Sequence, residues 1–247
     1  MVIPHLPDNC LRNKVILITG AGSGIGRAVA KAMSTYGATI VLVGKTTSKL
    51  ESIYDDIEQQ GGPTPAIFPM DFTGASEHDV DELINSIEQT FGRLDGVLHN
   101  AAHFGALTPF ASISSELWYT TMQVNINTPF LITRAALPLL KKSAAASIIF
   151  TTDAVGKKSK AYTGAYGVSK FAIEGMAQIL AQELESSHVR VNRIEPIEVK
   201  TGLTQRIYAG EEIEKLPMPD RITSTYVYLM SDESREIKGA SVVAAPQ

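Results

Sequence analysis

The chain has 247 residues, of which 44% are hydrophobic, and this length predicts one well-buried core rather than two independent domains. Its formal net charge of -4, without a long run of lysine or arginine, argues against binding to nucleic acid or to an anionic membrane surface. Cys10 is the only cysteine, so no disulfide can form within the chain, and a cytoplasmic location is expected. No apolar run reaches the roughly 18 residues of a membrane-spanning helix, and residues 1–12 lack the pattern of a signal peptide. These properties favour a small-molecule partner.

The first half of the chain alternates short apolar runs with helical patterns. A strand is predicted at residues 14–19, and a helix follows from Gly24 and stops at Gly37. The next predicted elements are a strand at 39–43, a helix at 48–60, a strand at 66–69 and a helix at 76–91. Ser76 and Asp79 have the spacing of a helix capping box, and Gly92 is a typical helix terminator.

The second half continues this alternation. The predicted elements are strands at 95–99 and 147–151, a long helical segment between them at about 114–140, a helix at about 164–187, and strands at 189–194 and 240–244. Because parallel neighbours need helical crossovers, this order predicts a single-domain, doubly wound α/β Rossmann fold with a parallel sheet of about seven strands and helices on both faces. The polar, turn-rich stretch 201–218 is predicted to be a mobile flap over the site.

The glycines between the first strand and the first helix predict an anion-binding turn. Gly20, Gly24 and Gly26 lie there together with Ser23 and Ile25. Glycines let the backbone approach a pyrophosphate, and the N-terminus of the helix offers unpaired N–H groups. A glycine-rich turn is also compatible with a simple tight connection, but its place between a strand and a helix favours a phosphate cradle.

Tyr166 and Lys170 form a candidate pair for proton transfer. They are four residues apart, so on a helix they share one face and can reach the same ligand. A free phenol has a pKa near 10, so proton transfer by Tyr166 near neutral pH needs nearby positive charge to favour the phenolate. The same spacing occurs in structural pairs on exposed helices, but its place after the fifth predicted strand favours catalysis.

The spacing Gly-x-x-x-Gly-x-Gly, preceded by Thr19, resembles the short-chain dehydrogenase/reductase family rather than ordinary Rossmann enzymes. The resemblance extends over about residues 12–245. Its further motifs are Asp71-Phe72 after the third strand, Asn100-Ala101-Ala102 after the fourth, Asn125 in the long helix, Tyr166 with Lys170, and the segment from Pro196 to Thr201. The segments around residues 98–101, 122–125 and 170–172 are similar to bacterial reductases of the YciK type.

This resemblance implies roles for individual residues. The implied cofactor contacts beyond the cradle are Asp71, Phe72, Asn100, Ala101, Ala102, Tyr166, Lys170, Pro196, Ile197, Val199 and Thr201. Asn125 is implied to hold a water that links Lys170 to solvent, although it is also compatible with capping or kinking its helix. Ala102 and Ile197 replace glycines of the family motifs, so tighter backbone approaches to the cofactor are expected.

The residues after the second strand predict which nicotinamide cofactor binds. An NAD enzyme usually has a carboxylate there to bind the ribose hydroxyls, whereas this chain has Gly44-Lys45-Thr46. Lys45 supplies a positive charge and Thr46 a hydroxyl, so NADP(H) is predicted in preference to NAD(H). The alternative is that Lys45 is only a solvated surface charge.

Asp153 lies where the family has a serine that hydrogen-bonds the substrate carbonyl. An ionised carboxylate cannot donate a hydrogen bond, and at about 5 Å from the reacting oxygen it would oppose developing negative charge by about 3 kcal/mol at an effective dielectric of about 20. Three solutions are open. In the first, Asp153 is protonated and donates a hydrogen bond to the substrate carbonyl. In the second, the hydroxyl of Thr151 or Thr152 takes the role of the serine. In the third, a cationic group of the substrate pairs with the Asp153 carboxylate.

The leading functional hypothesis is an NADP(H)-dependent oxidoreductase that interconverts a carbonyl and an alcohol on a small molecule, with Asn125, Asp153, Tyr166 and Lys170 at its catalytic centre. The competing hypothesis is a nucleotide-binding protein with little turnover and a regulatory or structural role. Residues 104–110 and 201–218 are expected to form the substrate walls. No cluster of histidine and carboxylate has the spacing of metal ligands, so no metal is expected. By resemblance, the two long helices predict a homodimer or homotetramer.

Overall fold

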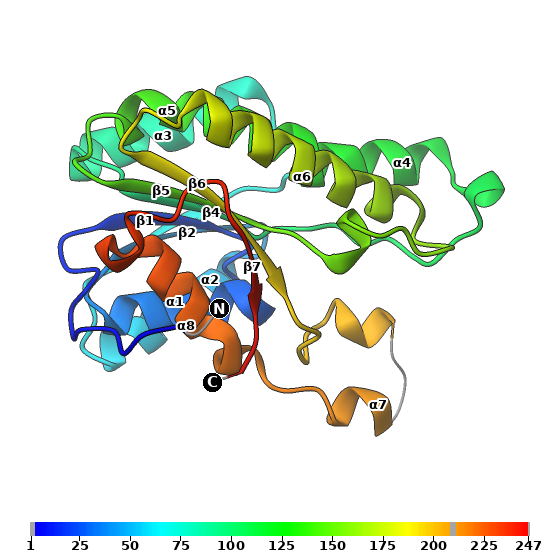
Figure 1. Ribbon diagram of the computed structural model, residues 1–247, viewed down its shortest axis with the longest axis horizontal. Helices are drawn as coiled ribbons and strands as arrows, with labels where there is room; N and C mark the ends of the chain where they lie inside the picture. The colour runs from blue at the N-terminus through cyan, green and yellow to red at the C-terminus, as the bar shows by residue number, and fades with distance from the viewer. Residues whose placement is uncertain (1–2, 208–210, 247) are drawn as a thin grey trace.

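Seven parallel strands form one sheet in the order β3-β2-β1-β4-β5-β6-β7 (Figure 1). This arrangement comes from a computed structural model, which describes residues 3–207 and 211–246. The strands are β1 (Val15–Thr19), β2 (Thr39–Gly44), β3 (Ala66–Pro69), β4 (Gly96–His99), β5 (Ala146–Thr151), β6 (Val189–Pro196) and β7 (Ser241–Ala244). Each predicted strand is present, and the predicted doubly wound α/β Rossmann fold is confirmed.

Both faces of the sheet are buried because the strands are apolar on both sides. Val15 and Leu17 of β1 pack into the core on one face, whereas Ile16 and Ile18 pack into the core on the other. The first face is covered by α3 (Glu77–Phe91), α5 (Thr128–Leu140) and α6 (Gly164–Glu183), and the second by α1 (Gly24–Thr35), α2 (Thr47–Gln59) and α8 (Thr223–Met230) (Figure 1). Each fully buried leucine or isoleucine contributes about 1.5–3 kcal/mol.

Local sequence signals set the ends of α3 as predicted. The Ser76 hydroxyl accepts a hydrogen bond from the Asp79 N–H, and the Ser76 N–H donates to the Asp79 carboxylate at 2.8 Å. Gly92 ends the helix in the left-handed conformation, with φ of 68°. The capping box is therefore confirmed. In contrast, α6 ends at Glu183 rather than near Ser187.

The long helical segment predicted at 114–140 is divided into three parts. These are α4 (Ser115–Met122), a π-helical segment (Gln123–Asn127) and α5. Pro129 has no N–H, so the α-helical hydrogen bond to the Asn125 carbonyl cannot form. The helix widens at this point, and the Thr128 N–H donates to the Gln123 carbonyl five residues earlier. Such π-helical turns often occur at functional sites.

The helix α8 was not predicted. Its residues Tyr226, Val227, Leu229 and Met230 are all buried, and only Thr223, Ser224 and Tyr228 are partly exposed. A short apolar run of this kind cannot be assigned to helix or strand by its periodicity. Five short 3-10 helices were also not predicted among the described residues: Phe110–Ser112, Ala154–Gly156, Thr204–Arg206, Pro219–Ile222 and Asp232–Ser234.

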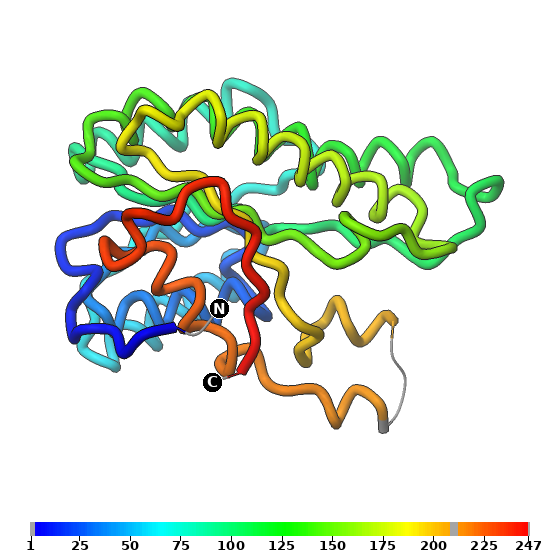
Figure 2. The backbone as a smooth tube through the Cα atoms, in the orientation of Figure 1, coloured from blue at the N-terminus to red at the C-terminus, as the bar shows by residue number. Residues whose placement is uncertain are grey.

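Two long connections leave the carboxyl ends of the strands. The connection after β4 and the connection after β6 extend from the sheet in the same direction, in green and orange respectively (Figure 2). The second contains the predicted flap, 201–218, which includes a 3-10 turn and α7 (Glu211–Glu214). Residues 208–210 of the flap lie outside the described part of the chain.

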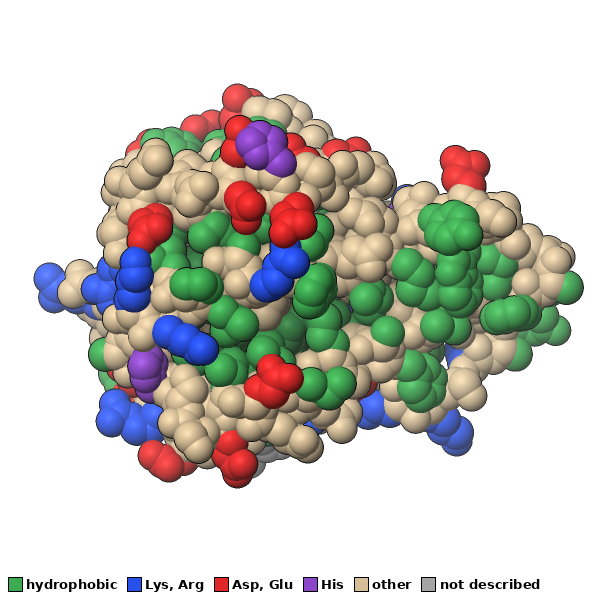
Figure 3. All heavy atoms as spheres, turned by 90° about the horizontal axis from the view of Figure 1, so that it is seen from above, with side chains coloured by type: hydrophobic (Ala, Val, Ile, Leu, Met, Phe, Trp, Pro, Cys, Tyr) green, Lys and Arg blue, Asp and Glu red, His purple; other side chains and the backbone are tan. Residues whose placement is uncertain are grey.

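The outer surface of α4, α5 and α6 carries large apolar side chains. Figure 3 looks onto this face and shows apolar atoms across it, with a dense group at the end that extends beyond the sheet. Phe110 and Tyr119 are 73% and 70% exposed, and Ile179 on α6 is 61% exposed. Phe130 on α5 and Phe171 on α6 are also exposed. These side chains are not needed for the core of the described chain.

Candidate active site

The turn between β1 and α1 has room only for glycine at two positions. A Cβ atom added to Gly26 would lie 2.3 Å from the Gly20 carbonyl oxygen, and one added to Gly20 would lie 2.8 Å from the Cα of Ala101. Gly20 also has φ of 65°, a conformation that side chains disfavour. The close packing of these glycines brings the turn after β1 against the turn after β4. This contact lies at the point where the strand order reverses, which is where open α/β sheets bind ligands.

The N-terminus of α1 opens onto this point. Ser23, the residue before the helix, is exposed and extended, and its side chain makes no capping hydrogen bond. The first N–H groups of α1, beginning with Gly24 and Ile25, are therefore not capped by Ser23. A Cβ added to Gly24 would lie 3.2 Å from the Thr201 side chain, so the segment after β6 closes the other side of the turn. This arrangement is suited to a phosphate group.

Thr19 joins the ends of β1 and β4. Its hydroxyl donates to the Leu98 carbonyl and accepts from the N–H groups of Asn100 at 2.9 Å and Ala101 at 3.1 Å. The Asn100 amide donates in return to the Thr19 carbonyl at 3.3 Å. Asn100 and Ala101 are thus fixed beside the glycine turn, with Ala102 partly exposed after them. Thr19 was noted in the sequence only as part of the motif, but it organises this part of the site.

The residues predicted to bind the adenosine end lie after β2 and β3. Lys45 and Thr46 are exposed, and Thr46 precedes α2 without using its hydroxyl as a cap. The Thr73 N–H is the main cause that lowers the pKa of Asp71, and the charge of Lys45 also contributes. Lys45 is therefore close enough to Asp71 for their charges to interact. Phe72 is buried, and its carbonyl accepts from the Thr128 hydroxyl at 3.5 Å.

The predicted nicotinamide segment follows β6. Pro196 pairs with Ala244 of β7, and the Ile197 N–H donates to the Ala244 carbonyl at 3.0 Å. The Val199 side chain is only 2% exposed, so it packs in the core rather than toward a ligand. Thr201 is held in its turn by hydrogen bonds with the Thr204 hydroxyl.

Tyr166, Lys170 and Asp153 meet beside the carboxyl end of β5. The Tyr166 phenol donates to the Asp153 carboxylate with 2.7 Å between Oη and Oδ2. Lys170 lies on the same face of α6, with Nζ 5.4 Å from the centre of the Tyr166 ring, and donates to the Thr151 carbonyl at 3.0 Å. The other Asp153 oxygen, Oδ1, accepts from the Val155 N–H at 3.0 Å.

Burial sets the proton affinities of the pair. It is the main cause that raises the pKa of Tyr166 well above 10, and the charge and hydrogen bond of Asp153 add to it. Burial lowers the pKa of Lys170 to about 8, while the charges of Asp153 and Glu174 partly oppose this. Burial and Asp153 therefore both favour the neutral phenol of Tyr166.

Replacement of Lys170 by methionine is expected to stabilise the fold at pH 7. The fall in the Lys170 pKa from 10.5 to about 8 corresponds to about 3 kcal/mol, and loss of one hydrogen bond offsets about 1 kcal/mol of this. Because the folded pKa is below the unfolded pKa, the cost is full below about pH 8 and disappears as pH rises toward 10.5. Urea unfolding is therefore expected to show a gain of about 2 kcal/mol at pH 7 that narrows at pH 9.5. A variant that is less stable than the parent at pH 7 would contradict this.

Asn125 fastens α6 to the turn after β4. Its amide oxygen accepts from the His103 N–H at 2.7 Å, and its amide nitrogen donates to the His103 carbonyl at 3.0 Å and to the Ser169 hydroxyl at 2.8 Å. The Ser169 hydroxyl then donates to the Tyr166 carbonyl at 2.7 Å. Ser169 was not predicted as a site residue, since a serine in the middle of a helix gives no signal of this role. The His103 ring also contacts the Thr121 hydroxyl, with 3.2 Å between Nδ1 and Oγ1.

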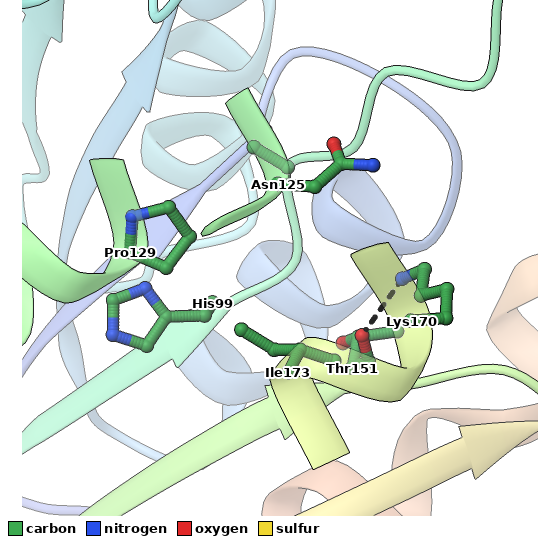
Figure 4. A pocket seen from close by; sticks show the side chains of 7 residues that line it. His99, Asn125, Pro129, Thr151, Lys170 and Ile173 are labelled. Carbon is green, nitrogen blue, oxygen red and sulfur yellow. Dashed lines mark hydrogen bonds between the residues drawn. The ribbon is translucent and has the colours of Figure 1, made fainter. Parts of the chain in front are cut away.

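A small cavity of about 10 Å³, about the volume that one water needs, lies beside the Lys170 side chain (Figure 4). Its lining includes His99, Asn125, Thr151 and Lys170. His99 stacks on Phe150, and its Nε2 contacts the Thr133 hydroxyl at 2.9 Å. Within the described residues the Nδ1 of His99 is buried without a hydrogen-bond partner, and the buried Thr151 hydroxyl lies close to the Tyr226 phenol. Burial lowers the pKa of His99 to about 3, so the ring is neutral at pH 7.

The structure does not place a threonine hydroxyl at the position of the missing serine. The Thr152 hydroxyl donates to the Ile194 carbonyl at 3.2 Å, and the Thr151 hydroxyl is buried close to the Tyr226 phenol. The phenol of Tyr166 instead contacts Asp153 itself. The two remaining solutions are a protonated Asp153 and a cationic substrate group. Phe104, which packs edge-on against Tyr166 with ring centres 5.0 Å apart, forms one wall beside this pair.

No group of three or more histidine, cysteine, aspartate or glutamate residues in ranges 3–207 and 211–246 is arranged to hold a metal ion. Within the same ranges, no helix is both long enough and apolar enough to cross a membrane.

Comparison with known proteins identifies the family. The family model for short chain dehydrogenases matches residues 14–212. The uncharacterized oxidoreductase YciK of Escherichia coli (strain K12) is 39% identical over 97% of this chain and 94% of that protein. A solved structure from Pseudomonas syringae, assigned to the short chain dehydrogenases, has a TM-score of 0.96 and 43% identity over 99% of each chain. Another, from Shigella flexneri 2a str. 301 in complex with NADP, has a TM-score of 0.94 and 38% identity over 97% of this chain and 100% of the other. The chain is therefore an oxidoreductase that belongs to the short-chain dehydrogenase family and is of the YciK type.

Proposed function

We propose that the chain is an NADP(H)-dependent enzyme that interconverts a carbonyl and an alcohol on a small molecule. The observation that carries this proposal is the position of Tyr166 and Lys170 on one face of α6, beside the carboxyl end of β5. The glycine turn lies at the same edge of the sheet, at the ends of β1 and β4. Oxidation of NADPH, followed by absorbance with a panel of aldehydes and ketones, is the direct test.

The residues of the cradle fit a dinucleotide. The glycine turn leaves no space for side chains, and the N-terminus of α1 is not capped by a side chain. When bound, the nicotinamide supplies or accepts the hydride. The residues that would hold the cofactor are Gly20, Ser23, Gly24, Ile25 and Gly26 at the phosphates, Lys45, Thr46, Asp71 and Phe72 at the adenosine, and Asn100, Ala101, Ala102, Tyr166, Lys170, Pro196, Ile197, Val199 and Thr201 toward the nicotinamide. Val199 would contribute its backbone, because its side chain is buried in the core.

Each proposed catalytic residue has a separate role in proton transfer. Tyr166 exchanges a proton with the substrate oxygen, and in the structure its phenol is hydrogen-bonded to Asp153. Lys170 lies next to the ring and supplies positive charge. Asn125 positions α6 through Ser169, and its carbonyl, which cannot accept the α-helical bond from Pro129, is the atom suited to hold a water toward Lys170.

NADP(H) is proposed in preference to NAD(H). Lys45 and Thr46 stand exposed directly after β2, where a ribose 2′-phosphate would lie. The solved relative from Shigella flexneri is in complex with NADP, which supports the same choice.

Replacement of Lys45 by aspartate is expected to weaken NADPH binding about 10- to 100-fold, because a hydrogen bond to a charged group is worth about 1.5–3 kcal/mol. Binding of NADH is expected to be unchanged or stronger. Calorimetric titration with both cofactors measures the preference. Lys141→Asp is the matched control, since Lys141 is exposed and follows α5 at the opposite end of the strands. An unchanged NADPH preference in Lys45→Asp would remove Lys45 from the account.

A second candidate function is supported by the contact between Tyr166 and Asp153. The phenol keeps its proton and donates a hydrogen bond to the carboxylate, and its pKa is raised by burial and by Asp153. A site in this state disfavours alcohol oxidation, since it lacks a ready phenolate base. The chain would then bind the nucleotide in a regulatory or structural role with little turnover.

Self-association is proposed through the apolar face of α4, α5 and α6 (Figure 3). The aromatic side chains on this face are exposed and do not belong to the core, and exposed apolar patches often mark interfaces between proteins. Static light scattering is expected to give a mass of two or four chains, and Phe171→Asp together with Ile179→Asp is expected to lower that mass. A monomer at micromolar concentration would contradict the proposal.

A further inference from the structure

The Asp153 carboxylate has no cation in direct contact with it in the described part of the chain. Its two oxygens accept from the Tyr166 phenol and from the Val155 N–H, both neutral donors. No lysine, arginine or histidine nitrogen in ranges 3–207 and 211–246 lies within 4.0 Å of it. Lys170 donates to the Thr151 carbonyl instead, and its charge interacts with Asp153 only from beyond ion-pair distance. Partly buried carboxylates are normally paired, so this one is available to a cation brought by a ligand.

The Asp153 carboxylate lies next to the Tyr166 phenol, the group that would react with the substrate. Its Oδ2 lies 2.7 Å from the phenol oxygen that would exchange a proton with the substrate. The nearest part of a bound substrate is therefore the atom that Tyr166 contacts. Phe104 packs edge-on against the Tyr166 ring, and an aromatic ring also stabilises a nearby cation.

A carbonyl and a protonated imine respond to this charge in opposite ways. Hydride addition to a ketone places negative charge on oxygen, which the carboxylate at about 5 Å opposes by about 3 kcal/mol at an effective dielectric of about 20. A protonated imine carries positive charge on nitrogen before the reaction, so the same carboxylate binds it and keeps it protonated.

We propose that this site also reduces protonated imines, and that Asp153 selects them by pairing with the iminium nitrogen. The inference rests on the proposed function, because the reduced nicotinamide is the hydride donor. In this step the hydride forms a C–H bond to the iminium carbon and the C=N π bond breaks. Its electron pair remains on nitrogen, which becomes a neutral secondary amine, while the nicotinamide is oxidised.

This reaction suits the protonation state of the site. Hydride addition to an iminium ion gives a neutral amine, so it needs no proton from Tyr166. The raised pKa of the Tyr166 phenol therefore does not slow this reaction. The amine product then takes a proton from solvent and leaves as an ammonium ion. Tyr166 and Asp153 hold the N–H of the substrate by hydrogen bonds throughout.

The test compares two size-matched pairs of substrates: 2-methyl-1-pyrroline with cyclopentanone, and 3,4-dihydroisoquinoline with α-tetralone. Oxidation of NADPH is measured for the parent chain and for Asp153→Ser, Asp153→Asn and the control Asp81→Asn, an exposed carboxylate on α3. We expect the parent to favour the imine of a pair at least 10-fold in kcat/KM. Both Asp153 variants are expected to reduce that preference at least 10-fold, and the control is expected to keep it.

Binding gives a readout that does not depend on turnover. Calorimetry of 1,2,3,4-tetrahydroisoquinoline, a cation at pH 7, against the chain with NADP⁺ is expected to show at least 10-fold weaker binding in Asp153→Asn. Equal imine preference or equal amine binding in folded Asp153 variants would overturn the inference. Reduction of ketones without any reduction of imines would overturn it and leave the proposed function standing. If NADPH binds but no member of either pair is reduced by any variant, the inference and the proposed function both fail.

Discussion

Replacement of Asp153 by serine is expected to raise ketone reduction about 100-fold. The carboxylate opposes charge that develops on the substrate oxygen by about 3 kcal/mol, and each 1.36 kcal/mol is a factor of ten in rate. Serine removes this charge and restores a hydroxyl that can donate to the substrate. The Tyr166 pKa is also expected to fall, because Asp153 raises it by its charge and by its hydrogen bond. Initial rates of NADPH oxidation with the carbonyl panel measure the effect.

The outcome separates the two candidate functions. A parent chain that reduces members of the panel measurably, and improves on Asp153→Ser, is an enzyme slowed by its carboxylate. An inert parent with an active Asp153→Ser variant favours the nucleotide-binding role. If Asp153→Ser is folded and reduces ketones no faster than a measurably active parent, the carboxylate does not oppose the reaction, and the electrostatic account of this site is wrong. Thermal unfolding of the variant provides the control for folding.

Replacement of Tyr166 by phenylalanine is expected to lower turnover of any neutral carbonyl substrate about 1,000-fold, within the range that general acid–base catalysis contributes. The ring is kept, so its edge-on contact with Phe104 remains and NADPH binding is expected to change less than about 3-fold. Single-turnover kinetics and calorimetry measure the two quantities separately. Tyr36→Phe, at the end of α1, is the matched control.

Retention of more than a tenth of the parent activity in Tyr166→Phe would exclude Tyr166 as the proton donor. For an iminium substrate a smaller loss is expected, because its reduction does not need the Tyr166 proton. The ratio of the two losses therefore reports how much of each reaction depends on the phenol.

Much of the fold could be predicted because its signals are local. The capping box of Ser76 and Asp79, the glycine after α3 and the alternation of strands and helices each follow from a few neighbouring residues. The helix α8 could not be predicted, since a short, mostly buried segment lacks the clear periodicity that identifies a helix. The π-helical turn before Pro129 had a cause in the sequence, a missing N–H, but its effect depends on how α5 packs.

The candidate site could be predicted in part. The spacing of Tyr166 and Lys170 puts them on one helix face wherever that helix lies. The direction of the Asp153 side chain depends on its extended backbone, with φ of -160°, and on the 3-10 turn that follows, so sequence alone left three alternatives open. The hydrogen bond from Asn125 to Ser169 joins residues that are 44 positions apart in the sequence, and it forms only when α6 packs beside the π-helical turn. Contacts of this kind are set by tertiary packing rather than by local pattern.

The central claim is that a nicotinamide dinucleotide lies at the glycine turn and reaches Tyr166, and calorimetric titration with NADPH tests it most directly. The folded parent chain is predicted to bind one NADPH per chain. Gly26→Ala is predicted to bind it at least 10-fold more weakly, because the added methyl would lie 2.3 Å from the Gly20 carbonyl oxygen. Absence of heat from saturating NADPH with folded parent protein, or equal affinity in Gly26→Ala, would contradict the account.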